Sequence, residues 1–354
     1  MITVQQQDLL HALKAVKGTM VKNNLNPILN TVHLVANNNS IEITATDCST
    51  HAQAKIEALV SEDMDICVNM DKFDTIVNAL DNNFIKMNLT DNQLEVKQGR
   101  TVFNILVLDS NEYPTVSFET SDNKVEIDAH TFVNCINKVI VSVAPEFNNL
   151  LSGVCITFNK TNIEFGGCDG NRLGVVNIEY PTEIDGQWII PAKTLANVIK
   201  FAIDNVTLYF TDKRVTFKVG NILYSTALLL GQYPAYKQLI PTEFKSKAII
   251  KKMPLIKAIE KTVIMADLKK NKVGLSFKDN ELTVSTSDNE VGNAEDIIDV
   301  DYTGEQTIYF NPNFLLNGLK TMETDTITVC MNSPASATII LGDYKYLIMP
   351  IQVR

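Results

Sequence analysis

Residues 162–171 read NIEFGGCDGN, an extended stretch that ends in a turn around an aspartate. Similar stretches stand at residues 40–49, SIEITATDCS, and at residues 281–290, ELTVSTSDNE. The aspartates of these turns lie 122 and 119 residues apart: Asp47, Asp169 and Asp288. A spacing this regular indicates an internal repeat, and a period of about 120 residues is far longer than that of solenoid repeats. The stretch therefore predicts whole domains of one type placed in a row.

A second extended stretch recurs at the same spacing and ends each time in glycine. Its copies read QLEVKQG, RVTFKVG and SATIILG. The closing glycines lie 121 and 122 residues apart: Gly99, Gly220 and Gly342. Apolar and polar residues that alternate between turn residues are typical of half-buried β-strands. Each copy of the repeat should therefore contain several strands that pair in antiparallel runs.

Two helix signals also occur once in every copy. The first helix is expected in DLLHALKAV, HTFVNCINKV and MPLIKAIEKTV, led by residues that lie 123 apart: Leu9, Phe132 and Leu255. The second is expected in DKFDTIVNAL, AKTLANVIKF and PNFLLNGLKT, led by residues that lie 122 and 120 apart: Phe73, Leu195 and Leu315. Apolar residues at i, i+4 and i+7, such as Leu9, Leu13 and Val16, indicate a one-sided helix. Pro191 and Pro312 are expected in first helical turns, where proline is tolerated.

The fold class that follows is α+β. Each copy should hold two helices and an antiparallel sheet, with the helices interspersed among the strands. Boundaries between the copies are expected after EYPTVSF and after QYPAYKQLIP. The expected domains are therefore residues 1–120, 121–244 and 245–354.

The charge and its distribution limit the class of partner. The formal net charge of −10 argues by itself against a nucleic-acid partner. Charges farther apart than about 8 Å are largely screened in the cell, so a basic inner surface can coexist with an acidic outer one. Only four residues are arginine: Arg100, Arg172, Arg214 and Arg354. Few bidentate contacts to bases are then available, which disfavours sequence-specific reading of DNA.

Cysteine and histidine usage points to the cytoplasm and away from a metal site. The six cysteines form no CxxC pair, and the four histidines show no HxxxH or HExxH spacing. Scattered cysteines without a signal-peptide pattern are typical of reduced thiols in the cytosol. The longest apolar runs are too short to span a bilayer, so no membrane partner is expected.

The glycine-rich stretch GGCDGNRLG is not a nucleotide cradle. A dinucleotide fingerprint needs GxGxxG at the opening of a helix, whereas the residues after Gly170 alternate like another strand. No GxxxxGK[ST] motif occurs, and no nucleophile–histidine–acid set is visible. No cofactor and no catalytic residue is therefore expected, and the stretch is interpreted as a strand–turn–strand.

Several segments together resemble the β sliding clamp family, the processivity subunit of bacterial DNA polymerase III. The first copy contributes NPILNTVHLV and GRTVFNILVLDSNEYP, and the second contributes LLSGVCITF, CDGNRLG and GQYPAYKQLIP. The third contributes AEDIIDVDYTGEQTIYFNPNFLLNGLK and the tail YLIMPIQ. The order and spacing of these pieces cover the whole chain.

The resemblance implies a non-catalytic sliding clamp. Family members have three domains of like topology, and a head-to-tail homodimer closes a ring around duplex DNA. The expected partners are duplex DNA bound without regard to sequence, the polymerase catalytic subunit, a clamp loader and other proteins with clamp-motif peptides. Loading should need the separate ATP-driven loader, because this chain has no nucleotide motif.

The resemblance also implies a peptide pocket between the second and third domains. The family often has histidine where this chain has Asn171, and arginine where it has Gln238. Carried over by motif, the pocket comprises Leu151, Cys168, Gly170, Asn171, Arg172, Leu173, Pro234, Gln238, Leu239, Asn311, Phe314, Ala335, Met349, Pro350 and Ile351.

Lysines off the apolar helix stripes, with Lys22 on the NNLNPIL loop, are the expected DNA contacts, because hydrated ammonium groups bind phosphate with loose geometry. The DNA-facing set is Lys14, Lys17, Lys22, Lys72, Lys193, Lys200, Lys257 and Lys261. The family positions of the dimer interface match Phe103 and Ile105 in GRTVFNIL, and Ile264 and Met265 in TVIMAD.

Two other function classes stay open at this point. An enzyme could use Asp169 beside Arg172, or the carboxylates of the matching turns, for acid–base chemistry. Their recurrence in all three copies favours a turn role, because aspartate accepts hydrogen bonds from the backbone in turns. A monomeric three-domain binding module would share the fold but would neither close a ring nor retain trapped DNA.

Overall fold

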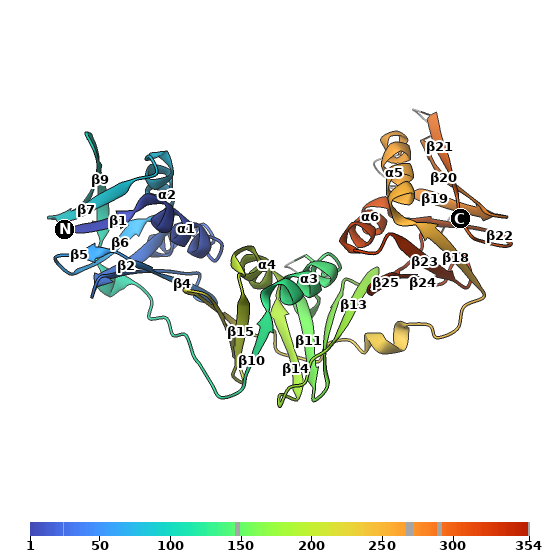
Figure 1. The fold of residues 1–354 in the computed structure, drawn as a ribbon, viewed down its shortest axis with the longest axis horizontal. Helices are drawn as coiled ribbons and strands as arrows, with labels where there is room; N and C mark the ends of the chain where they lie inside the picture. The colour runs from blue at the N-terminus through green and yellow to red at the C-terminus, as the bar shows by residue number, and fades with distance from the viewer. Residues whose placement is uncertain (24, 146–148, 267–271, 289–291, 353–354) are drawn as a thin grey trace. The chain divides into compact units, whose positions relative to one another are not determined.

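The computed structural model describes residues 1–23, 25–145, 149–266, 272–288 and 292–352 (Figure 1). Backbone contacts divide the chain into two compact units. The first unit comprises Met1–Val133 and Lys193–Leu228, and the second comprises Asn134–Ala192 and Leu229–Arg354. Asp288 belongs to a described strand, but its side chain lies outside the described part of the structure.

The first copy alternates strands with two helices and begins at the N-terminus. Its elements in chain order are β1 (Ile2–Gln5), α1 (Gln6–Lys17), β2 (Thr31–Asn37), β3 (Ser40–Thr46), β4 (Thr50–Glu57), β5 (Leu59–Val60), β6 (Met64–Asn69), α2 (Met70–Ala79), β7 (Phe84–Thr90), β8 (Gln93–Gln98) and β9 (Thr101–Leu108).

The other two copies repeat this order without a counterpart of the short β5. The second copy consists of β10 (Lys124–Asp128), α3 (Ala129–Ile140), β11 (Gly153–Asn159), β12 (Asn162–Cys168), β13 (Arg172–Glu179), β14 (Gly186–Pro191), α4 (Ala192–Phe201), β15 (Asn205–Phe210), β16 (Arg214–Val219) and β17 (Ile222–Ala227). The third consists of β18 (Ser246–Lys251), α5 (Lys252–Thr262), β19 (Val273–Lys278), β20 (Glu281–Asp288), β21 (Gly292–Asp299), β22 (Glu305–Phe310), α6 (Pro312–Thr321), β23 (Thr326–Met331), β24 (Thr338–Leu341) and β25 (Lys345–Ile348).

The predicted helices are confirmed, and burial explains why they form. Leu9, Leu13 and Val16 are all fully buried on one face of α1. Pro312 opens α6, and the side chain of Asn311 caps that helix by accepting the backbone N–H groups of residues 313 and 314. Pro191 was placed wrongly, because it is the last residue of β14 and precedes α4.

All the strand pairings in the described residues are antiparallel, as expected. The first unit holds one sheet in the order β10-β15-β16-β17-β4-β3-β2-β6-β9-β8-β7-β1-β5. The second unit holds a sheet in the order β14-β11-β12-β13-β25-β24-β23-β18 and a smaller one in the order β21-β20-β19-β22. The α+β class and the three copies predicted from the sequence are thus confirmed.

Neighbouring copies are joined through their sheets. The strand that follows the Asp turn in the first copy, β4, pairs with the last strand of the second copy, β17. In the same way β13 of the second copy pairs with β25 of the third. We call these two pairings intercopy seams. Two strands of the corresponding kind, β21 and β9, have no such partner among the described residues.

Both seams have the same register. Gln53, six places after the turn residue Asp47, lies opposite Leu223, three places after Gly220. Val175, six places after Asp169, lies opposite Lys345, three places after Gly342. The recurring Asp and Gly signals therefore mark the two strands that meet at each seam. Within the described residues, no helix is long and apolar enough to cross a membrane.

Candidate functional site

The turn between β12 and β13 is held by the carboxylate of Asp169. One of its oxygens, Oδ1, accepts the backbone N–H groups of Asn171 at 2.9 Å and Arg172 at 3.0 Å. Asp47 does the same at the equivalent turn of the first copy, accepting from Ser49 at 3.0 Å and Thr50 at 2.7 Å. The turn role inferred for these two aspartates is therefore confirmed.

Asp169 has a second role, because it also neutralises Arg172. Its Oδ2 accepts from Nε of Arg172 at 3.0 Å, and both side chains are about nine-tenths buried. The guanidinium carbon lies 4.2 Å from the centre of the Phe314 ring on α6. With the Asn317 amide oriented to satisfy both of its ends, its oxygen accepts from Nη1 of Arg172 at 3.0 Å. One arginine of the second copy is thus fixed against a helix of the third.

The C-terminal tail follows the same turn. Strand β25 pairs with β13, placing Ile348 opposite Arg172. The backbone N–H of Met349 then donates to the carbonyl of Asn171 at 2.8 Å. Two residues later the N–H of Ile351 donates to the carbonyl of Tyr309 at 2.7 Å. The tail residues are therefore positioned by backbone hydrogen bonds beside the Asp169 turn.

An apolar cluster lies beneath this turn. Cys168 and Leu173, which face each other across the β12–β13 hairpin, belong to it together with Leu347. Leu151 packs against the cluster and is half-buried. Burial raises the pKa of the Cys168 thiol, so this cysteine stays protonated and behaves as a small apolar group.

Two tyrosines attach the following linker to the cluster. Tyr233 and Tyr236 are buried, and their rings meet edge to face with centres 5.9 Å apart. The hydroxyl of Tyr233 accepts the backbone N–H of Cys168 at 3.1 Å. The hydroxyl of Tyr236 donates to Oε1 of Glu164 at 2.8 Å. The linker between these rings and the third copy therefore begins next to the turn.

The structure gathers most of the predicted pocket residues in one place. Arg172 contacts Phe314, Asn171 bonds Met349, and Cys168 packs with Leu173 and Leu151, as described above. Pro234, Gln238 and Leu239 are exposed on the linker segment that Tyr233 and Tyr236 anchor. The Asp169 turn contains Gly170, and the N-cap of α6 is Asn311. The C-terminal tail contains Pro350 and Ile351.

Ala335 is the predicted pocket residue with the weakest link to the rest. It is exposed on the loop between β23 and β24, and Ala337 on the same loop packs against the apolar cluster. The assignment of all these residues to a pocket stays a prediction.

Family models for three domains match this chain one after another. The N-terminal, central and C-terminal domains of the DNA polymerase III beta subunit match residues 1–117, 126–235 and 237–352. The chain belongs to the DNA polymerase III beta subunit family. It is a DNA sliding clamp and processivity factor, and it is not an enzyme.

Relatives of the family cover the full length of the chain. The beta sliding clamp of Synechococcus elongatus is 26% identical over 372 aligned residues, covering 100% of this chain and 99% of the relative. A solved DnaN sliding clamp from Pseudomonas aeruginosa, bound to griselimycin, has a TM-score of 0.93 at 22% identity and covers 99% of both chains. A DNA polymerase sliding clamp from Bacillus subtilis has a TM-score of 0.93 at 23% identity, with 100% and 99% covered. These structures share the fold of this beta subunit family member.

The lysines expected to face DNA differ in how free their charges are. Lys17 is ion-paired with Asp74 at 2.6 Å and with Asp71 at 3.5 Å, and the pairing raises its pKa. Lys261 is paired with Asp296 at 2.9 Å. Lys261 is exposed all the same, as are Lys14, Lys22, Lys72, Lys200 and Lys257, whereas Lys193 is half-buried.

Lys138, in the last turn of α3, shows that a lysine on a helix need not be a free surface charge. Its side chain is only 6% exposed and forms ion pairs with Asp343 and Glu323.

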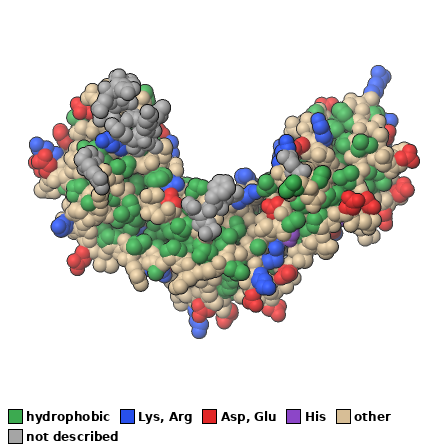
Figure 2. All heavy atoms as spheres, turned by 180° about the vertical axis from the view of Figure 1, so that it is seen from behind, with side chains coloured by type: hydrophobic (Ala, Val, Ile, Leu, Met, Phe, Trp, Pro, Cys, Tyr) green, Lys and Arg blue, Asp and Glu red, His purple; other side chains and the backbone are tan. Residues whose placement is uncertain are grey.

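Figure 2 shows one face of the molecule, on which lysine and arginine side chains are scattered among acidic ones.

The predicted interface residues lie beside the two unpaired strand edges. Strand β9 pairs with β8 over Thr101–Leu106, but on its other side it pairs with β6 only at Val107 and Leu108. Phe103 is half-buried and Ile105 is buried, so both point toward the protein interior. Their neighbours Val102 and Leu106 are exposed, Leu106 at 64%.

Near the other edge, Ile264 is 81% exposed in the 3₁₀ turn η5 (Val263–Met265) that follows α5. Met265 lies next to Gly292, the first residue of β21, since a Cβ placed there would stand 3.4 Å from its Cε. Ile264 and Met265 are therefore next to β21, whose outer edge has no partner strand among the described residues.

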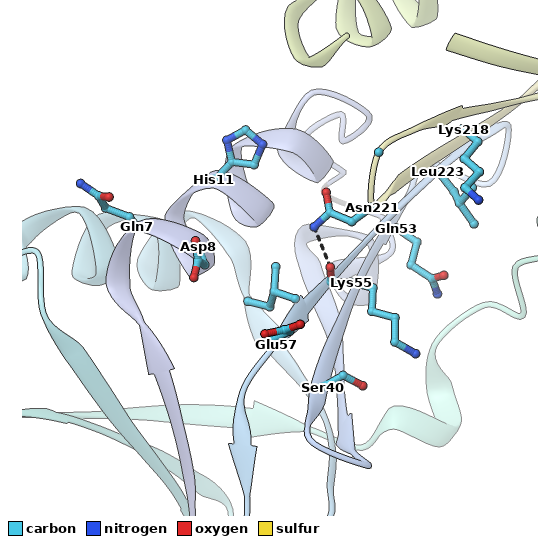
Figure 3. A pocket seen from close by; sticks show the side chains of 12 residues that line it. Gln7, Asp8, His11, Ser40, Gln53, Lys55, Glu57, Lys218, Asn221 and Leu223 are labelled. Carbon is cyan, nitrogen blue, oxygen red and sulfur yellow. Dashed lines mark hydrogen bonds between the residues drawn. The ribbon is translucent and has the colours of Figure 1, made fainter. Parts of the chain in front are cut away.

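A separate cavity of about 870 Å³ lies in the first unit, at the seam between β4 and β17 (Figure 3). Lys55 and Asn221 of its lining are joined by two hydrogen bonds, from the Lys55 N–H to the Asn221 carbonyl at 3.1 Å and from Asn221 Nδ2 to the Lys55 carbonyl at 2.7 Å. Its charged lining is mixed, with Asp8 and Glu57 as well as Lys218. Its lining, among the described residues, includes none of the predicted site residues.

Sequence reasoning missed the residues that support the turn. Tyr233 and Tyr236 stand three places apart in QYPAYKQL, a spacing that could have marked a one-sided packing surface. Glu164 is a single charge in the apolar strand β12, which signals a buried partner. Asn317 carried no signal, because its contact with Arg172 depends on the packing of the third copy against the second.

Proposed function

We propose that two copies of this chain join head to tail through β21 and β9 and close a ring around duplex DNA. The observation that carries the proposal is the repeated seam. At both internal junctions, the strand that follows the Asp turn of one copy pairs with the last strand of the next copy, and the register is the same. Only β21 and β9 lack that pairing among the described residues. If the same pairing is applied between chains, β21 of one chain pairs with β9 of a second chain. Two such interfaces, one at each end of the two chains, close the ring.

The rule also gives the register of the proposed interface. Gln53 and Val175 each pair within their own hairpin with the residue three places before the turn aspartate, and in the third copy that position, Ser285, pairs with Glu295. Val102 stands three places after Gly99, so by analogy with the two seams Glu295 of one chain should lie opposite Val102 of the other. Unpaired strand edges are prone to add a further strand, and here the exposed apolar residues Leu106 and Ile264 would be covered as well.

The repeat supports three domains, at residues 1–120, 121–244 and 245–354, in each chain. Exposed lysines recur on the helices of these copies, as on α1, α2 and α5. Ammonium groups contact phosphates without reading bases, so the ring could slide along any sequence. The partners are then duplex DNA, the polymerase catalytic subunit and a clamp loader, and the place of action is the cytoplasm.

Partner proteins would attach through a peptide held at the Asp169 turn. Exposed Leu239 and Met349 supply apolar contacts, and the turn and the tail supply backbone groups that fix register. Deletion of residues 349–354 should abolish binding of a clamp-motif peptide while the thermal unfolding midpoint stays near that of the full chain. Undiminished binding by the shortened chain would place the peptide elsewhere.

Solution mass and topology together test the ring. Light scattering over a dilution series should give twice the mass of one chain. After incubation with a clamp loader and ATP, the protein should stay on nicked circular DNA at high salt and should leave once the circle is cut. A mass of one chain at every concentration, or equal retention on linear DNA, contradicts the ring and favours a monomeric binding module.

A further inference from the structure

The charged side chains among the proposed peptide-site residues and their sequence neighbours are paired within the chain. Among the described pocket residues and their immediate neighbours in sequence, three side chains are charged: Asp169, Arg172 and Lys237. Asp169 and Arg172 form the buried ion pair described above. A guanidinium that is also stacked on Phe314 and bonded to Asn317 has little capacity left for a peptide carboxylate.

Lys237 is neutralised by a different carboxylate. Its Nζ lies 2.9 Å from Oε1 of Glu164, which projects from β12. The Lys237 side chain is 66% exposed, whereas that of Glu164 is 9% exposed. The exposed Lys237 side chain can adopt several conformations, whereas the buried Glu164 side chain is fixed by its surroundings. The position of the Glu164 carboxylate therefore determines where the Lys237 ammonium group is held.

Glu164 is held in place from three sides. Besides Lys237, it accepts hydrogen bonds from the hydroxyl of Tyr236 at 2.8 Å and from Nδ2 of Asn177 at 3.3 Å. The Tyr236 ring can lie over β12 because residue 166 is glycine, where a Cβ would come within 2.8 Å of the hydroxyl. Burial and the bond to Glu164 raise the pKa of Tyr236, so its hydroxyl remains a donor.

Apart from the paired Lys237, the exposed side chains among these residues are neutral. Asn171 and Gln238 present amides, and Pro234, Leu239 and Met349 present apolar surface. Gln238 is next to Lys237 in the 3₁₀ turn η4 (Tyr236–Leu239), so the captured cation starts only one residue away. A charged peptide side chain placed here would lose water and find no unpaired opposite charge among these residues.

We propose that this site selects a peptide with apolar anchors and an uncharged polar residue between them, and that Glu164 maintains this selectivity by holding Lys237. The proposal rests on the peptide-binding role proposed above. Glu164 acts here as a positioning residue, because it meets the linker and not the peptide.

The test uses three labelled peptides that share a leucine and a phenylalanine anchor and differ at one position between them. That position carries glutamine, aspartate or lysine, and fluorescence polarisation gives each Kd on the full chain. We expect the glutamine peptide to bind at least about fivefold more tightly than either charged peptide. Its Kd should change less than about twofold between about 50 and about 500 mM salt.

Glu164→Gln should free Lys237 while keeping an oxygen for Tyr236. The aspartate peptide should then bind about threefold more tightly at low salt, and the gain should vanish at high salt. Adding Lys237→Gln to this variant should remove the gain, which identifies the freed cation as its cause. Gln238→Lys adds a cation at an exposed position with no buried group disturbed, and should give a similar gain.

The outcomes separate this inference from the peptide site itself. Failure of all three peptides to bind the full chain overturns the site and the inference with it. Tight binding of the glutamine peptide, together with equally tight and salt-sensitive binding of the aspartate peptide, overturns the inference alone. Since residues 353 and 354 lie outside the described part of the chain, the same measurements are made on a chain that ends at Gln352, which should give the same order of affinities.

Discussion

At the scale of single residues, Asp169 and Asp47 show how one turn can acquire a further role. Both accept two backbone N–H groups, and only Asp169 also pairs with an arginine. The turn role could be predicted, because the aspartate recurs at a fixed spacing. The ion pair could not, because Arg172 has no counterpart in the other copies and its stacking partner Phe314 is far along the chain.

The pair Asp169→Ala and Asp47→Ala separates these two roles. Asp47→Ala removes turn hydrogen bonds and should lower the free energy of unfolding by about 1 kcal/mol. Asp169→Ala also leaves a buried guanidinium without its counter-charge, and should cost about 3 kcal/mol or more. Urea unfolding midpoints of the two variants compare them directly. Equal losses would mean that the Arg172 ion pair contributes no stability.

His51 makes the first seam sensitive to acid. It lies opposite Ser225 at the start of β4, is 7% exposed, and has its Nδ1 2.7 Å from Oγ1 of Thr46. Burial lowers the pKa of His51, the nearby Arg214 lowers it further, and Asp47 opposes them. The folded chain therefore favours neutral histidine, and the unfolded chain takes up a proton more readily.

The sign of the pH dependence follows from that difference. The stabilisation is complete above the ordinary histidine pKa of about 6.5 and is lost as pH falls through the lower folded value. The unfolding midpoint should therefore drop between about pH 7 and about pH 5, and His51→Gln should flatten this part of the profile. His11→Gln, at an exposed position on α1, is the matched control variant.

At the scale of elements, periodicity predicted the helices well and the strand partners poorly. A helix such as α1 makes its hydrogen bonds within itself, so its apolar spacing is sufficient evidence. A strand such as β9 is defined by what lies beside it, and the sequence does not give that neighbour. The interface prediction named Phe103, which is half-buried, and Ile105, which is buried, whereas Val102 and Leu106 on the same strand are exposed.

Helix α1 offers two lysines that test the DNA-contact assignment. Lys14 is exposed, whereas Lys17 is tied to Asp74 and Asp71. If Lys14 contacts a phosphate, Lys14→Gln should lower the steepness of log K against log salt by about 0.9. Lys17→Gln should change it less, because the cation is already shared with two carboxylates. Salt titrations of DNA binding measure both slopes, and identical slopes in Lys14→Gln and the unmodified chain would remove Lys14 from the contact set.

At the scale of the whole molecule, the seams explain why backbone contacts divide the second copy between two units. Strands β10, β15, β16 and β17 continue the sheet of the first copy, while β11, β12, β13 and β14 continue that of the third. Sequence spacing predicts the repeat but cannot predict that sheets run across its boundaries. Main-chain hydrogen bonds between copies do not depend on which side chains the paired residues carry.

The proposed register predicts a specific covalent dimer. Val102→Cys with Glu295→Cys should join two chains on oxidation, because residues opposite each other in adjacent strands lie within the reach of a disulfide. The matched control is Val102→Cys with Asp299→Cys, which is four residues out of register. Both are made in a Cys48→Ser background, since Cys48 is the exposed native thiol among the described residues. Non-reducing electrophoresis should show the dimer only for the first pair, and a dimer from the control would reject the register.

The repeated seam also changes what the linkers between copies are for. Neighbouring copies are joined by main-chain hydrogen bonds along β4–β17 and β13–β25, so the covalent connection only raises the local concentration of one strand near the other. A chain cleaved between its first and second copies should therefore keep those pieces associated. The number of genes that encode the assembly is then independent of its architecture, since one longer chain or several shorter ones could present the same succession of strands.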